Sequence, residues 1–203
     1  ASPAETAPAA RLDDPRGALV VIGASTGGPA ALAELFGALP GLRCPIIVAQ
    51  HMPAGFTGLF AERLGRAASF PVVEAHDGQR LVAGRAYVAP GGAHLEIAAD
   101  GGPPKFRVTA RAPRDLFTPS VDRLFRSAAA VAGGGALGIV LTGMGSDGRE
   151  GVVAIREAGG RTIAESEESA VVFGMPREAA LSGAVDEVRP LAEIPAAILR
   201  LLG

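Results

Sequence analysis

The chain has 203 residues, which is enough for one domain of ordinary size with a sizeable core. A formal net charge of -2 and an aromatic content of 4% argue against a nucleic-acid surface and against base-stacking platforms. Cys44 is the only cysteine, so no intrachain disulfide is possible, and no apolar run is long enough to span a membrane. The N-terminal residues also lack a signal-peptide pattern, so we expect a cytoplasmic protein that is not embedded in a membrane.

Residues 1–17 are rich in alanine and proline and show no hydrophobic periodicity. This composition is typical of a linker, and we expect the segment to be disordered. Because the sequence does not begin with methionine, we interpret it either as the remnant of a longer chain or as a native tail left after processing. Residues 18–203 then form a single folded domain.

An apolar run at 20–22 predicts the first buried strand, and a helical pattern opens at Pro29. Between them, the segment 23–27 (GASTG) fits G-x-S-x-G, the pattern of a nucleophile elbow that lifts the hydroxyl of Ser25 above a sheet edge. The same turn is compatible with a plain strand–helix connection, or with a phosphate-binding loop at a helix N-terminus. The turn alone leaves these three interpretations open.

A second apolar strand at 45–49 is followed by His51 and then by a helical pattern between 56 and 64. Alternation of strand and helix implies βαβ units, so we expect a doubly wound α/β domain, with a mainly parallel sheet and helices on both faces. Ser25 and His51 each follow a strand directly. Both are therefore expected at the carboxyl edge of the sheet, where such folds bind ligands.

Three short strand-like runs in the middle of the chain, at 85–90, 94–98 and 106–109, are separated by glycine-rich turns. They predict a small antiparallel hairpin region inserted between the parallel units. A helix is expected to begin at Pro119-Ser120 and to end at the three glycines 133–135.

The last third of the chain returns to the alternating pattern. A buried strand at 136–141 runs through a glycine-rich turn to Asp147 and then into a helix. Glu165, Glu167 and Glu168 are interpreted as part of a solvated loop. The remaining predicted elements are a strand at 161–164, an apolar turn at 171–176, a helix at 177–182, a strand at 184–188 and a closing helix face between 194 and 201.

A serine nucleophile needs a base within hydrogen-bond reach, an acid that orients the base, and N–H donors for the oxyanion. Of the three histidines, only His51 directly follows a buried strand next to the serine strand in sequence; His76 falls in a turn-like surface stretch and His94 in an edge-strand pattern. His51 is equally compatible with a structural histidine at a helix entry. Asp147 also follows a strand end, where it fits the orienting acid, a helix N-cap, or both.

Two stretches offer backbone N–H groups to a developing oxyanion, namely the turn Gly143-Met144-Gly145 and the helix start at Thr26-Gly27. No spacing of histidine, cysteine or acidic residues matches a zinc, calcium or magnesium site. We therefore expect no metal and no cofactor.

Six segments form a recognisable set: IGASTGGP (22–29), QHMPAGF (50–56), YVAPG (87–91), PSVD (119–122), LTGMGSDG (141–148) and VFGMPREA (172–179). In this order and spacing they resemble the catalytic domain of the chemotaxis receptor protein-glutamate methylesterases of the CheB type. The resemblance covers residues 18–202, which is nearly the whole chain.

The resemblance implies a doubly wound α/β domain in which Ser25 is the nucleophile, His51 the general base and then acid, and Asp147 the group that orients His51. It also implies that the backbone N–H of Met144 serves the oxyanion and that the Thr26 hydroxyl helps to hold His51. The implied reaction is hydrolysis of glutamate γ-methyl esters on the cytoplasmic helices of methylated chemoreceptors, with release of methanol. Deamidation of receptor glutamines is implied as a second activity.

Two features depart from the resemblance. Family members usually carry a polar, basic segment where Leu116-Phe117-Thr118 stands here, and they carry an N-terminal receiver domain that residues 1–17 are too short to form. We expect that receiver domain in a longer native chain. A serine esterase or amidase with a different protein or small acyl substrate is a second hypothesis, and a catalytically silent phosphate-binding module built on the turn at 23–28 is a third.

Overall fold

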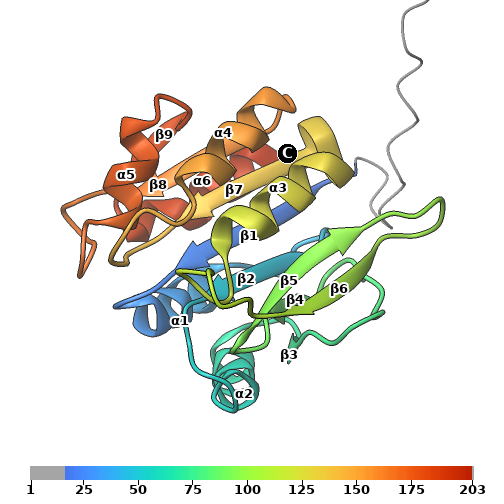
Figure 1. Ribbon diagram of the computed structural model, residues 1–203. Helices are drawn as coiled ribbons and strands as arrows, with labels where there is room; N and C mark the ends of the chain where they lie inside the picture. The colour runs from blue at the N-terminus through green and yellow to red at the C-terminus, as the bar shows by residue number, and fades with distance from the viewer. Residues whose placement is uncertain (1–16, 203) are drawn as a thin grey trace, which may run out of the picture.

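The computed structural model describes residues 17–202, so the linker predicted for residues 1–17 lies outside the described residues except for Gly17. Within this range, seven strands form one sheet in the order β3-β4-β2-β1-β7-β8-β9, and every neighbouring pair is parallel. The mainly parallel sheet is thus confirmed (Figure 1). Its strands are β1 (Leu19–Ala24), β2 (Ile46–Gln50), β3 (Val72–Glu74), β4 (Ala86–Val88), β7 (Ala136–Val140), β8 (Arg161–Glu165) and β9 (Glu187–Arg189).

Helices cover both faces of the sheet, as predicted. One apolar cluster lies between the sheet and α1, α2 and α6, and a second lies between the sheet and α3, α4 and α5. β1, β2, β4 and β7 are buried on both faces, which explains their near-continuous apolar sequences. The helices are α1 (Gly28–Ala38), α2 (Thr57–Ala67), α3 (Val121–Ala132), α4 (Arg149–Glu157), α5 (Met175–Leu181) and α6 (Ile194–Leu202), with short 3-10 turns η1 (Gly133–Gly135) and η2 (Leu191–Glu193).

The predicted hairpin region contains two strands rather than three. β5 (Ala93–Ala98) and β6 (Lys105–Ala110) pair antiparallel and lie beside α3, as Figure 1 shows. The run predicted at 85–90 instead forms β4, a strand of the parallel sheet between β2 and β3. The reason is burial, because all three residues of β4 are fully enclosed and a hairpin strand at the surface would leave one face wet.

Other boundaries differ by a few residues. The apolar turn predicted at 171–176 already contains the start of α5, since Met175 is fully buried and Pro176 occupies the first turn of the helix. The last strand is β9, shorter and later than the predicted 184–188. β3 was not predicted from the sequence, because it is a three-residue edge strand that is only half-buried.

The topology places three predicted site residues at one edge. The chain passes from β1 to β2 on one side and later returns to β7 on the other side of β1. In open α/β sheets, ligands bind beyond the carboxyl ends of the strands at such a change of winding direction. The loops that follow β1, β2 and β7 carry Ser25, His51 and Asp147.

Gly23, within β1, lies directly under the start of α3. A Cβ at this position would overlap the Cγ1 of Val121, whose branched side chain has one strongly preferred rotamer in a helix. We therefore expect Gly23→Ala to lower the free energy of unfolding in urea by about 1–3 kcal/mol, the usual cost of overpacking.

Gly102→Ala is the matched control, because nothing lies within 4 Å of a Cβ added there. Its free energy of unfolding should change by less than about 0.5 kcal/mol. An unchanged unfolding midpoint for Gly23→Ala would mean that α3 does not pack on β1 as tightly as described.

Candidate active site

Ser25 begins the loop after β1 and is held by its backbone. Its N–H donates to the carbonyl oxygen of Thr142 at 3.0 Å, and its own carbonyl accepts from the N–H of Gly28 at 2.9 Å. Gly27 has a φ of 83°, which favours glycine, and it caps the N-terminus of α1. The side chain of Ser25 is left half-buried at the top of the sheet, as the G-x-S-x-G pattern predicted.

Gln50, the last residue of β2, was not predicted from the sequence as a site residue. Its side chain is 2% exposed, and its amide nitrogen donates to the carbonyl oxygens of Ser25 (2.9 Å) and His51 (3.1 Å). A Cβ on Gly28 would overlap the Gln50 side-chain oxygen, so this glycine, the first residue of α1, makes room for the Gln50 side chain. A polar residue at the end of an otherwise apolar buried strand was the available signal.

His51 lies next to the serine loop and is paired with Asp147. Its backbone N–H donates to the carbonyl oxygen of Ala24 at 3.0 Å, and its Nε2 lies 2.8 Å from Oδ2 of Asp147. Since the carboxylate accepts, the proton is assigned to Nε2, and Nδ1 is left as the basic nitrogen. Among the hydrogen bonds of residues 17–202, none joins the Ser25 hydroxyl to His51.

Asp147 is buried beneath His51 and caps α3. Oδ1 accepts from the Ser120 hydroxyl (3.1 Å) and the N–H of Asp122 (2.9 Å), while Oδ2 accepts from the N–H of Val121 (2.7 Å) as well as from His51. Burial raises the pKa of Asp147, but the bonds from His51, Asp122 and Val121 outweigh it and hold the pKa below the usual range. The carboxylate is therefore ionised and able to orient the imidazole.

Asp147 does not cap the helix that follows it in sequence, which was the structural role predicted for it. That role belongs to Asp122, whose Oδ1 accepts from the N–H groups of Gly148 (2.9 Å) and Gly151 (2.7 Å) at the start of α4. The two helices thus exchange capping aspartates. Burial raises the pKa of Asp122, partly offset by these hydrogen bonds, and the nearby charge of Asp147 raises it further.

The turn after β7 places Gly143, the neighbour of Met144 in the chain, against Ser25. Gly143 donates to the carbonyl oxygen of Val172 (3.0 Å), and a Cβ on Gly143 would lie 2.7 Å from Cβ of Ser25. Within the part of the chain that the structure describes, the N–H of Met144 has no acceptor. Met144 is 68% exposed, so the turn that carries this N–H stands at the surface.

Thr26 is exposed, and the hydrogen bond that the structure gives it joins its carbonyl oxygen to the hydroxyl of Thr142 at 2.9 Å. No hydrogen bond of its side chain to His51 is present among residues 17–202. The structure therefore brings His51 and Asp147 together and places the Ser25 loop and the Met144 turn beside them, while the Thr26 hydroxyl makes no hydrogen bond to His51 among these residues.

Glu165 corrects the prediction of a solvated loop. It ends β8 with 0% exposure, and its carboxylate accepts from the N–H of Thr142 (2.7 Å) and the hydroxyl of Ser169 (2.9 Å). Glu167 and Glu168 are exposed, as predicted. Because Thr142 also bonds the loops of Thr26 and Val172, Glu165 anchors the turn that carries Met144.

Burial raises the pKa of Glu165, and the two hydrogen bonds offset this only in part. A raised folded-state pKa means that stability falls as the pH rises from about 4.5 through the folded value, because the folded state holds the proton longer. Glu165→Gln removes this titration. We expect the free energy of unfolding of the variant, relative to the wild type, to increase in urea titrations as the pH rises above 4.5. Glu168→Gln is the exposed control, and a constant difference for Glu165→Gln would contradict the expectation.

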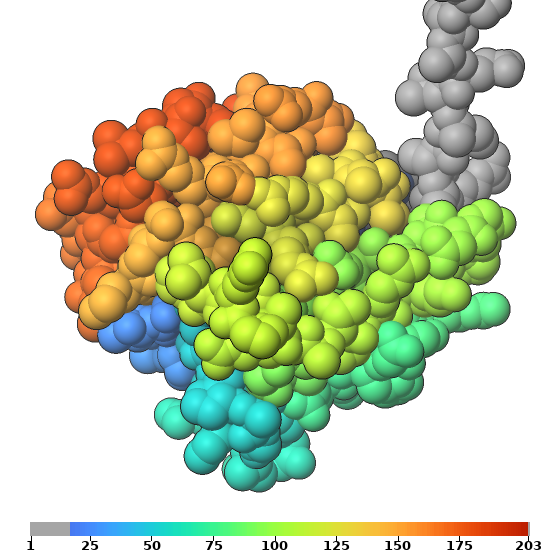
Figure 2. Space-filling model, in the orientation of Figure 1, coloured from blue at the N-terminus to red at the C-terminus, as the bar shows by residue number. Residues whose placement is uncertain are grey.

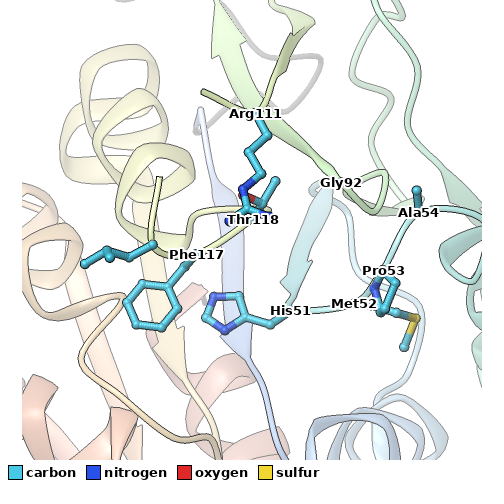
Figure 3. Close-up of a pocket in the computed structure, with 9 residues that line it drawn as sticks. His51, Met52, Pro53, Ala54, Gly92, Arg111, Phe117 and Thr118 are labelled. Atoms are coloured by element: carbon cyan, nitrogen blue, oxygen red, sulfur yellow. The ribbon is translucent and has the colours of Figure 1, made fainter. Parts of the chain in front are cut away.

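A cleft of about 500 Å³ opens beside His51. Figure 3 shows the ring of Phe117 facing the His51 imidazole; their centroids are 5.1 Å apart and their planes differ by 7°. The segment that departs from the family pattern therefore forms one wall of the cleft. The lining residues are His51, Met52, Pro53, Ala54, Gly92, Arg111, Leu116, Phe117 and Thr118.

Among residues 17–202, no group of three or more histidine, cysteine, aspartate or glutamate side chains is placed to hold a metal ion. No helix in this range is both long and apolar enough to cross a membrane.

An elbow serine and a hydrogen-bonded histidine–aspartate pair at the carboxyl edge of a parallel sheet are features that α/β serine hydrolases share. The chain belongs to the CheB methylesterase family, which it matches over residues 20–198. It superposes on the catalytic domain of the CheB methylesterase of Thermotoga maritima with a TM-score of 0.88 at 39% identity, covering 91% of this chain and 98% of that one.

Two curated relatives give the same classification. Protein-glutamate methylesterase/protein-glutamine glutaminase 6 of Anaeromyxobacter dehalogenans is 55% identical over 89% of this chain, and the corresponding protein of Bordetella parapertussis is 50% identical over 91%. In both cases the match covers 53% of the relative. The chain thus spans about half the length of these relatives.

Proposed function

We propose that this chain is the catalytic domain of a protein-glutamate methylesterase that also deamidates glutamines. The observation that carries the proposal is the 2.8 Å bond between His51 and Asp147, which leaves a basic ring nitrogen next to the elbow loop of Ser25. The names of the curated relatives supply the substrate class, a glutamate ester or a glutamine amide in a protein. We infer that the substrates are the cytoplasmic helices of methylated chemoreceptors and that the reaction takes place in the cytoplasm.

The reaction begins with attack by the Ser25 hydroxyl on the γ-carbonyl carbon of the ester, while Nδ1 of His51 takes the proton. The bond between Ser25 and His51 forms when the serine side chain turns toward the bound substrate. Asp147 stabilises the imidazolium, and the N–H of Met144 donates to the oxyanion, a contribution of about 3–4 kcal/mol for a donor of this type.

Collapse of the tetrahedral intermediate breaks the bond to the methoxy oxygen, which receives the proton from His51 and leaves as methanol. Water then attacks the acyl-enzyme with the help of the same imidazole and restores Ser25 with a free γ-carboxylate. A glutamine amide follows the same route, and the protonated leaving group is ammonia. One set of groups thus accounts for both activities in the names of the relatives.

A second function is a serine esterase or amidase with a different substrate. It is favoured by the apolar wall that Leu116 and Phe117 give to the cleft, where family members usually carry polar, basic residues. A longer native chain with an N-terminal receiver domain is part of the main proposal, and the half-length coverage of the relatives supports it.

A substrate panel tests the two functions. The protein is incubated with receptor membranes carrying radiolabelled methyl esters and, separately, with small acyl esters such as p-nitrophenyl acetate. Release of labelled methanol as the faster reaction supports the methylesterase; hydrolysis of small esters alone supports the second function. If neither methanol release nor hydrolysis of small esters is detected, and a fluorophosphonate probe does not label the protein, the result supports the third hypothesis, a catalytically silent phosphate-binding module.

A further inference from the structure

A second histidine–aspartate pair lies outside the groups used above. His94, in β5, is fully buried, and its Nε2 lies 2.8 Å from Oδ2 of Asp115. The same carboxylate oxygen accepts from the N–H of Ala112 at 2.6 Å. His94 therefore holds Asp115, which lies in the middle of the segment that connects β6 to α3.

The other ring nitrogen of His94 binds the end of that segment that directly precedes α3. Nδ1 of His94 lies 3.2 Å from the N–H of Ser120, and this N–H can only donate. His94 is thus held as the neutral tautomer with its proton on Nε2, and both nitrogens are engaged. The yellow-green segment around residues 111–120 stands on the surface in Figure 2, so a single buried side chain ties an exposed segment to the hairpin.

The segment that His94 holds acts on the imidazole of His51 in two ways, directly through Phe117 and indirectly through Ser120. Phe117, between the two anchored residues, stacks on the His51 ring. Ser120 donates its hydroxyl to Asp147, which in turn holds Nε2 of His51. A connected series of hydrogen bonds therefore runs from Asp115 through His94, Ser120 and Asp147 to His51.

We propose that His94 is a positioning residue for the hydrolytic reaction: by accepting the N–H of Ser120 it fixes Asp147, and by holding the 112–120 segment it fixes Phe117 against His51. His94 does not line the cleft and touches no reacting atom. Its loss allows the His51 ring to tilt relative to Ser25, and a misplacement of about 1 Å in an active site costs about 10²-fold in rate.

Asparagine and glutamine separate the two bonds of His94. The Oδ1 of His94→Asn lies where Nδ1 lay and still accepts from Ser120, whereas the longer His94→Gln reaches Asp115 and loses Ser120. We expect His94→Asn to retain kcat for methanol release within about threefold, and His94→Gln and His94→Ala to lose about 10- to 100-fold. A residue that acts only through stability would make kcat, measured on folded protein, the same in all three.

Because kcat rests on the proposed function, the bond between His51 and Asp147 is also followed directly by proton NMR. The downfield imidazole N–H signal that disappears in His51→Gln reports it. This signal should persist in His94→Asn and broaden or shift in His94→Gln. If the wild type releases no methanol, the proposed function fails, and the same NMR comparison still supports or overturns the positioning role.

A second variant guards against misfolding of the buried site. Asp115→Ala acts at the more exposed end of the series and removes the same bond as His94→Asn, so it should keep kcat within about threefold and leave the His51 signal in place, as should the exposed His76→Ala. A wild-type kcat and an unchanged His51 signal in His94→Gln would overturn the proposal, as would a His94→Asn or Asp115→Ala variant that is no better than His94→Gln.

Discussion

Ser25→Ala should reduce methanol release by about four to six orders of magnitude, because removal of the nucleophile leaves only binding and oxyanion stabilisation. The fold should be unaffected. Among residues 17–202 the Ser25 hydroxyl has no hydrogen-bond partner, and all three backbone bonds of the elbow remain possible for alanine. The free energy of unfolding should therefore change by less than about 0.5 kcal/mol.

Ser146→Ala is the matched control for this experiment. Ser146 is exposed in the turn next to Asp147, at the same edge of the sheet, so the change removes a hydroxyl from the same rim. It should retain both methanol release and labelling by a fluorophosphonate, and Ser25→Ala should lose both. Methanol release by Ser25→Ala at a rate close to that of the wild type would remove the serine mechanism.

Asp147→Asn should lose both activity and stability. The amide cannot accept the four hydrogen bonds that the carboxylate accepts, and it no longer offers a charge to the imidazolium. We expect methanol release to fall by about 10⁴-fold, the loss typical of a triad aspartate changed to asparagine. The free energy of unfolding should fall by about 2–4 kcal/mol, because buried N–H donors at the start of α3 lose an ionised acceptor.

The exchange of capping aspartates provides the control. Asp122→Asn removes an equivalent carboxylate from the start of α4 but touches neither His51 nor Ser25. It should lower stability and leave kcat intact when both proteins are measured well below their unfolding midpoints. An equal loss of kcat in the two variants would mean that Asp147 acts only as a helix cap.

The acid side of the stability curve gives a second check on Asp147. Since its pKa is held below the usual range in the folded state, the charged form contributes stability above the unfolded value, and this contribution is lost as the pH falls through the folded value. The difference in unfolding free energy between wild type and Asp147→Asn should therefore shrink as the pH is lowered. Glu165→Gln should show the opposite trend in the same titrations.

The sequence predicted the parts of the site that depend on local pattern. Ser25, His51 and Asp147 each follow a run of buried apolar residues, and the rule that parallel strands end at one edge is enough to group them. The start of α3 at Ser120 was equally readable, since serine is a strong N-cap residue.

What the sequence did not predict depends on partners distant in the chain. The acceptor of the first N–H groups of α3 is Asp147, some 25 positions away, and no local pattern distinguishes it from the local cap that was expected. Glu165 was assigned to a solvated loop because charged residues are seldom fully buried, yet it is enclosed by the turn that it anchors. β4 was assigned to a hairpin because three residues carry too little periodicity to separate an edge strand from a central one.

The double duty of Asp147 has an evolutionary consequence. Selection for a folded domain preserves this carboxylate even when selection for catalysis is lifted, because α3 needs its cap either way. A duplicated gene whose product no longer turns over substrate would lose the serine hydroxyl first, since no hydrogen bond within residues 17–202 depends on it. The residue at the position of Ser25 therefore indicates whether a family member is catalytically active. An aspartate at the position of Asp147 does not, because the fold alone would preserve it.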